Sequence, residues 1–205
     1  MQNYFTLEFI LQPSSSHKSI DEFISPASHT LSMMPSLLSP REMPSIEGVR
    51  IPLNFYVVLK EPVLLAGMSR PRESTPWEKI GEAGFSNVVC LSSSEVNYDP
   101  YPLKVLFSAE LEDLYFGYGP EDPEREERLI RQAAAAINAK MDEGEGIVVH
   151  CMGGIGRTGT VLGCVLKDLG FSAKEVLNYL DEINMHRGFG GWPETEWQEE
   201  MVRKY

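Results

Sequence analysis

The sequence predicts an α/β protein, a three-layer sandwich in which a central, mostly parallel sheet is flanked by helices. Three observations in the 205-residue chain lead to this fold class. Short β-branched and apolar runs alternate with longer amphipathic segments. The run at 87–91 is almost uninterruptedly apolar, which is typical of a central parallel strand. The run at 146–149 ends in a glycine-rich loop that opens a helix, a unit found at the ligand-binding edge of such sheets.

The first elements are expected just after residue 50. The runs 55–59 and 63–66 are rich in β-formers, and Lys60-Glu61-Pro62 between them predicts a hairpin turn. The stretch Thr75-Pro76-Trp77-Glu78 predicts a helix start, with Thr75 as N-cap and Glu78 completing a capping box. This helix should end near Gly81 or Gly84, before strand 87–91.

The later elements complete the alternation. The acidic and aromatic segment 110–123 predicts a long loop, and long loops in compact domains are often active-site lids. The other expected elements are a strand at 104–107, a helix from Asp122-Pro123 to about 141, a strand at 147–150, and helices at 157–169, from Ser172 and from Pro193.

Residues 1–50 form a serine- and proline-rich N-terminal extension, and residues 51–205 form the folded domain. Residues 1–12 alternate loosely and predict an edge strand. Several apolar residues of the extension could pack on the domain, so an accessory arm is favoured over a separate functional module.

Composition narrows the function. The net charge of −12 argues against nucleic acid or an anionic membrane as a partner. Three cysteines (Cys90, Cys151 and Cys164) without framework spacing predict free thiols in a reducing, cytoplasmic setting. Neither a transmembrane helix nor a signal peptide is expected. The oligomeric state is left open.

The segment from His150 to Thr160 carries the chemistry. A strand ends at Cys151, three glycines follow, and Arg157 opens an apolar helix. Loop N–H groups and a helix N-terminus together make an anion site, which would stabilise a thiolate beside a guanidinium. Such a thiolate is a nucleophile aimed at a bound phosphate. A nucleotide-binding loop is excluded because its lysine and spacing are absent, and no metal or cofactor is expected.

The pattern His150-Cys151-x5-Arg157-Thr158-Gly159 resembles the signature loop of cysteine-based protein tyrosine phosphatases, in particular the dual-specificity branch. Its variable positions are similar to those of cyclin-dependent kinase-associated phosphatases. Weaker similarities lie in the expected order at 54–57, 64–67, 84–92 and 193–198, so the resemblance covers about 51–205. It implies a phosphotyrosine protein phosphatase-like fold.

The resemblance also implies roles for individual residues. Cys151 would attack phosphorus and form a phosphocysteine, and Arg157 would bind two phosphate oxygens. Thr158 would hydrogen-bond the sulfur, His150 would orient the loop, and Gln198 could order the hydrolytic water. The implied substrate-binding residues are Met152, Gly153, Gly154, Ile155, Gly156, Arg157 and Thr158.

The family requires an aspartic acid that protonates the leaving oxygen. Asp113 fits the family's pattern after a strand, and Asp122 lies nearer the usual spacing from the cysteine. Asp113 is favoured, because Asp122-Pro123 also reads as an ordinary helix cap.

The loop has no basic residue among its five variable positions, 152–156. This favours a phosphoprotein, chiefly phosphotyrosine and possibly phosphoserine or phosphothreonine, or a small phosphomonoester, over a highly charged inositol phosphate. The alternatives are a phosphatase acting on a non-protein phosphate and a catalytically weak, phosphate-dependent binding module.

Overall fold

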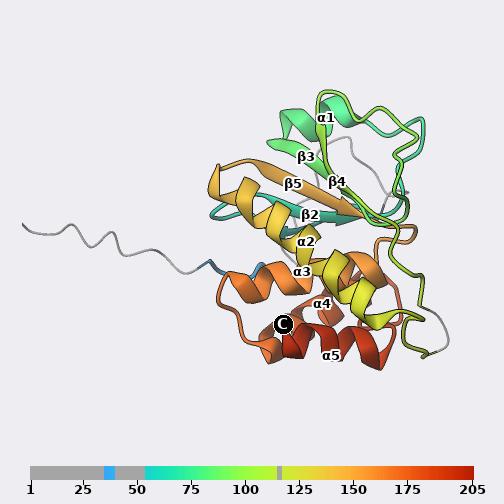
Figure 1. Ribbon diagram of the computed structural model, residues 1–205. Helices are drawn as coiled ribbons and strands as arrows, with labels where there is room; N and C mark the ends of the chain where they lie inside the picture. The colour runs from blue at the N-terminus through green and yellow to red at the C-terminus, as the bar shows by residue number, and fades with distance from the viewer. Residues whose placement is uncertain (1–34, 40–53, 115–116) are drawn as a thin grey trace, which may run out of the picture. The chain divides into compact units, whose positions relative to one another are not determined.

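The computed structural model describes residues 35–39, 54–114 and 117–205 (Figure 1). The edge strand expected at 1–12 lies outside these residues. The elements are β1 (Tyr56–Leu59), β2 (Leu65–Met68), α1 (Trp77–Glu82), β3 (Phe85–Cys90), β4 (Lys104–Ser108), α2 (Pro123–Asp142), β5 (Gly146–His150), α3 (Gly156–Asp168), α4 (Ala173–His186) and α5 (Glu196–Lys204).

The five strands form one sheet in the order β1-β2-β5-β3-β4. Strands β2, β5, β3 and β4 run parallel, and β1 pairs antiparallel with β2. The expected mostly parallel sheet is therefore confirmed. All five residues of β5 are buried, and this strand lies in the middle of the sheet. Its carboxyl end consequently opens between the carboxyl ends of two parallel neighbours, the usual place for a ligand site.

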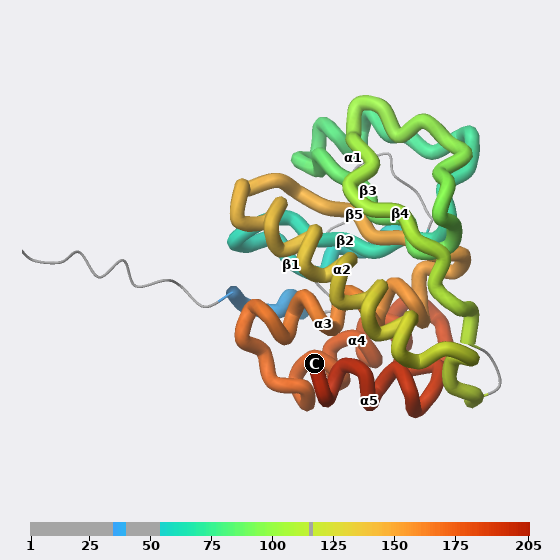
Figure 2. The backbone as a smooth tube through the Cα atoms, in the orientation of Figure 1, coloured from blue at the N-terminus to red at the C-terminus, as the bar shows by residue number. Residues whose placement is uncertain are grey.

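Helices cover the sheet in two layers. Figure 1 shows α1 on one side of the sheet and α2 to α5 on the other. Strand β5 alternates accordingly: Val148 belongs to the core cluster shared with α1, whereas Ile147 and Val149 belong to the cluster shared with α2 to α5. The tube in Figure 2 shows α3 next to the sheet, with α4 and α5 beyond it. The three-layer sandwich is confirmed.

Side-chain caps fix most helix starts. Asp122 accepts a hydrogen bond from the Arg125 backbone at the start of α2, and Ser172 forms the expected capping box at the start of α4. The capping box expected at Thr75 is wrong. The Thr75 hydroxyl accepts a hydrogen bond from the Arg72 N–H at 2.8 Å, so it is engaged upstream, and α1 begins at Trp77 without a side-chain cap.

Gly67 makes room for an aromatic ring between the first two strands. It is in register with Tyr56, and a Cβ on Gly67 would lie 2.3 Å from Cζ of that ring. No side chain fits there, so the glycine lets Tyr56 lie flat across β2 toward the loop that follows β5. None of the helices in the described part of the chain combines the length and apolar character needed to span a bilayer.

Candidate active site

Cys151 follows the last residue of β5 and is 2% exposed. Four residues separate it from α3, which starts at Gly156. No side chain caps this start of α3 from the N-cap position, Ile155. The strand–loop–helix unit thus brings a thiol to the N-terminus of a 13-residue helix, where unpaired N–H groups favour an anion.

The loop carbonyls are held on the outer side by groups from three other segments. The bonds run from Arg70 N to Met152 O (3.0 Å), from Asn54 Nδ2 to Gly153 O (a long 3.5 Å), and from Tyr56 Oη and Arg187 Nη1 to Gly154 O (3.1 and 3.3 Å). In a trans peptide the N–H points away from the C=O, so these bonds turn the loop N–H groups inward. The Gly154 N–H donates to Cys151 Sγ at 3.2 Å.

Gly154 is required by both conformation and space. Its φ is +71°, in the left-handed region, and a Cβ would lie 2.4 Å from the carbonyl carbon of Met68. At position 154 the glycine therefore reflects close approach to β2 as well as an unusual backbone.

Arg157 and Asp113 meet at the mouth of this loop. Arg157 is 8% exposed, and its Nη2 forms an ion pair with Asp113 Oδ2 at 2.7 Å. Its Nη1 donates to Leu111 O at 3.2 Å, which ties the backbone of the same loop to the guanidinium. Asp122, the rival aspartate, lies elsewhere, since its carboxylate caps α2. The structure brings together Asp113 and Arg157, and the catalytic role of Asp113 stays a prediction.

Two buried polar atoms at the start of α3 have no hydrogen-bond partner among the described residues: Arg157 Nε and Thr158 Oγ1. Leaving such a group unpaired when buried costs roughly 1–3 kcal/mol. Uncompensated donors beside a loop of converging N–H groups are what a site for a bound oxyanion requires. Both belong to residues that the sequence singled out.

His150 is fully buried and holds the loop from the strand side. Its Nε2 lies 2.5 Å from the Tyr98 hydroxyl, and its Nδ1 lies 3.3 Å from Cys151 O. Burial lowers the pKa of His150 from 6.5 to about 4, so the ring is neutral at physiological pH. Burial raises the pKa of Tyr98, which keeps its proton. The two facts fit one arrangement, in which Tyr98 donates to Nε2 and Nδ1–H donates to the carbonyl.

Glu194, just before α5, and Gln198, in the first turn of α5, add two side chains at the start of α3. Gln198 is 2% exposed, and its Oε1 accepts from Glu194 N at 2.9 Å. A Cβ on Gly156 would lie 2.7 Å from Gln198 Nε2. The Glu194 carboxylate lies against Gly156, where a Cβ would overlap its Oε2. Burial and then the charge of Asp113 raise the pKa of Glu194, while Arg157 and the nearby Gly156 N–H oppose the rise. Sequence reasoning missed Glu194 because no spacing links it to the loop.

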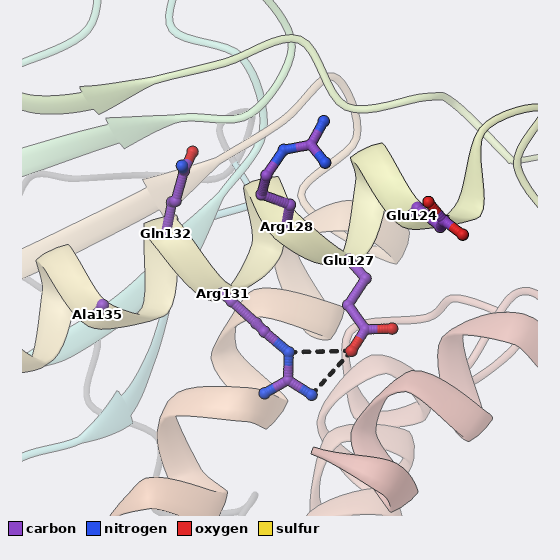
Figure 3. A pocket seen from close by; sticks show the side chains of 6 residues that line it. All are labelled: Glu124, Glu127, Arg128, Arg131, Gln132 and Ala135. Carbon is purple, nitrogen blue, oxygen red and sulfur yellow. Dashed lines mark hydrogen bonds and ion pairs between the residues drawn. The ribbon is translucent and has the colours of Figure 1, made fainter.

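Two cavities lie outside the cysteine loop. One of about 500 Å³ is lined by residues including Arg70, Arg72, Trp77 and Tyr98, and it adjoins the loop through Arg70 and Tyr98. The other, of about 480 Å³, is lined by six residues of α2 and is shown in Figure 3. No group of three or more His, Cys, Asp or Glu side chains suited to a metal occurs among the described residues.

Taken together, the sheet edge, the loop, the buried thiol and the arginine form a site suited to a bound oxyanion. The sequence profile of the Swiss Army Knife protein DSP-PTPase phosphatase domain matches residues 55–188. Since this match spans more than half of the chain, the protein belongs to that family.

Solved structures agree on the fold. Tk-PTP in its active form is 26% identical, with a TM-score of 0.51 over 68% of this chain and 89% of that one. The catalytic domain of the PP-IP phosphatase SIW14 from S. cerevisiae is 19% identical, with a TM-score of 0.54 over 77% and 88%. Kinase-associated phosphatase (KAP), with its catalytic cysteine replaced by serine, is 15% identical, with a TM-score of 0.50 over 69% and 84%.

Proposed function

We propose that this phosphatase hydrolyses protein phosphotyrosine through a phosphocysteine intermediate, with phosphoserine and phosphothreonine as further candidates. The observation that carries the chemistry is the cluster of Cys151, the inward N–H groups and the ion pair between Arg157 and Asp113 at 2.7 Å. The observation that favours a protein substrate is the absence of any lysine or arginine among the loop residues 152–156.

In the first half-reaction, Cys151 Sγ attacks phosphorus in line while the bond to the leaving oxygen breaks. Loop N–H groups and Arg157 hold the three non-bridging oxygens and the charge that develops on them. The proton that the leaving oxygen needs comes from Asp113. For this, Asp113 has to release Arg157, and the incoming phosphate dianion takes over the guanidinium. The ion pair of the free protein keeps the acid within reach.

In the second half-reaction, water attacks the phosphocysteine, and the carboxylate of Asp113 takes its proton. Cys151 leaves as a thiolate, helped by a hydrogen bond from Thr158, whose buried hydroxyl has no other partner among the described residues. Gln198 lies against Gly156 at the start of α3, where its amide can order the attacking water.

A second candidate is a phosphatase acting on a non-protein phosphate. The support for it is the shared fold with SIW14, which is described as a PP-IP phosphatase. The net charge of −12 weighs against so highly charged a substrate.

Hydrolysis of p-nitrophenyl phosphate in the presence of a chelator tests the chemistry. We expect turnover by the wild type and none by Cys151→Ser. Unchanged activity in Cys151→Ser contradicts the proposal. A panel of phosphotyrosine peptides, phosphoserine peptides and inositol phosphates then ranks the substrates, and a preference for inositol phosphates overturns the protein assignment.

A further inference from the structure

Arg187, at the C-terminal end of α4, is a cation that the proposed reaction does not use. Its guanidinium lies 3.9 Å from the centre of the Tyr56 ring and 4.9 Å from that of Phe189. Among the described residues no carboxylate forms an ion pair with it. A partly buried cation without an acidic partner is costly unless another negative group lies near.

Among the residues that the structure describes, the acceptors hydrogen-bonded to the guanidinium are neutral. Nη1 donates to Asn184 Oδ1 at 2.8 Å and to Gly154 O at 3.3 Å, and Nη2 donates to Asn54 O at 3.0 Å. Gly154 is the residue whose N–H donates to Cys151 Sγ. Arg187 and the thiol therefore contact the same residue, since the carbonyl of Gly154 accepts from Arg187 and its N–H donates to Cys151.

We propose that Arg187 is the counterion of the Cys151 thiolate and keeps the nucleophile ionised from behind the loop. Arg157 is the obvious alternative counterion. In the structure, however, Asp113 pairs with Arg157 at 2.7 Å, and in the proposed reaction the phosphate takes over that guanidinium. Arg187 faces the other side of the loop and keeps its charge available throughout. The proposal rests on Cys151 being the nucleophile.

The other ionisable groups around the thiol fit this assignment. Burial lowers the pKa of Arg187, whereas the interactions of its guanidinium with the Tyr56 and Cys151 side chains oppose the change. His150 is neutral and Tyr56 keeps its proton, since burial raises its pKa. The remaining charged groups of the site and its border are Asp113, Glu194, Arg157 and Arg70. Of these, Asp113 and Glu194 disfavour a thiolate, so a cation is needed to offset them.

The test follows alkylation of Cys151 by iodoacetamide across pH, with mass spectrometry identifying the modified cysteine. Only the thiolate reacts, so the rate reports its fraction without any substrate. In Arg187→Met the pH midpoint should rise by about one unit, which means a roughly tenfold slower reaction below the midpoint. Arg187→Lys keeps the charge and should stay near the wild type. Arg128→Met is the matched control, because Arg128 is exposed on α2 (Figure 3).

A purely structural role gives a different pattern. If Arg187 only positions Gly154, then Arg187→Met weakens phosphate binding while the midpoint of alkylation stays unchanged, and this overturns the proposal. Equal shifts in Arg187→Lys and Arg187→Met overturn it as well. Tyr56→Phe supplies a second variant: it removes the O–H bonded to Gly154 O and leaves the cation, so the midpoint should hold. Failure of the proposed function would appear separately, as p-nitrophenyl phosphate turnover that persists in Cys151→Ser.

Discussion

As the general acid of the proposed reaction, Asp113 has to change partners. Its carboxylate is 2.7 Å from Arg157 Nη2 in the free protein, yet a general acid must carry a proton and face the leaving oxygen. Displacement by the phosphate dianion resolves the conflict, because Arg157 gains a stronger anionic partner at the same time. Glu112 helps to fix the loop base, since its carboxylate accepts hydrogen bonds from the backbones of Glu121 and Asp122.

Replacing Asp113 by asparagine should lower kcat by roughly 10²- to 10³-fold, with little change in KM, because the amide cannot supply the proton. Steady-state kinetics with p-nitrophenyl phosphate measure the effect. Asp122→Asn is the matched control: asparagine also caps a helix, so activity and stability should stay near the wild type. If Asp122→Asn loses turnover and Asp113→Asn retains it, the assignment of the acid is wrong.

His150 should make stability depend on pH. Its pKa is lowered from 6.5 to about 4 in the folded state, so the unfolded chain binds the proton first as the pH falls. The stability contributed by the neutral ring is present above pH 6.5 and is lost as pH drops toward 4, by about 3 kcal/mol in total. Urea unfolding at several pH values should show a smaller loss over this window in His150→Asn. If the free energy of unfolding falls equally with pH in the wild type and in His150→Asn, His150 is not a buried, neutral histidine.

At the element scale, local sequence patterns predicted the strands and most helices. Short apolar runs between turn residues mark the buried strands, and apolar residues at helical spacing mark helices such as α2 and α4. The strand–loop–helix unit at Cys151 was also predictable, since its glycines and Arg157 are contiguous. The contacts that join the loop to the rest of the molecule were not predictable. Tyr56 and Arg187 lie 98 and 33 residues away from Gly154 in the sequence, and no local pattern encodes such contacts. The residues alone therefore predicted the contiguous loop, whereas Asp113 and Gln198, which are distant in sequence, were predicted only from the resemblance to a known family.

Gly67 connects the first two strands to the loop. Gly67→Ala forces the Tyr56 ring to move, because the new Cβ would overlap Cζ, and the hydroxyl then loses Gly154 O. We expect a stability loss of about 1–3 kcal/mol together with weaker binding of vanadate. Chemical denaturation and vanadate inhibition measure the two effects. Gly190→Ala is the control, since a Cβ there meets nothing within 4 Å. Unchanged vanadate affinity in Gly67→Ala contradicts the positioning of the loop by Tyr56.

At the scale of the whole molecule, a short piece of the serine- and proline-rich extension touches the domain. Leu37 packs against the core cluster of α2 to α5, and Leu38 packs against the cluster under α1. Tyr179 lies between this piece and the sheet, because its hydroxyl donates to Val58 O at 2.7 Å and the Leu38 backbone influences its pKa. The division at residues 50 and 51 stays a prediction, and we propose that 35–39 contributes to the stability of the domain.

The double variant Leu37→Ala, Leu38→Ala should therefore lower the free energy of unfolding by about 2 kcal/mol, given that both side chains are half-buried. Ser36→Ala, at an exposed position between them and Pro35, is the control. Thermal and urea unfolding of the full chain measure the difference. If the double variant is as stable as the control, these leucines add nothing to the domain.

The central claim is that Cys151 carries the phosphoryl group during turnover. Rapid acid quenching during hydrolysis of p-nitrophenyl phosphate, followed by mass spectrometry of the proteolysed protein, tests it most directly. The account predicts one phosphoryl group on the peptide that contains Cys151 in the wild type, and none in Cys151→Ser, which should also be inactive. Turnover without a phosphoryl group on Cys151, or a phosphoryl group found on another residue, would contradict it.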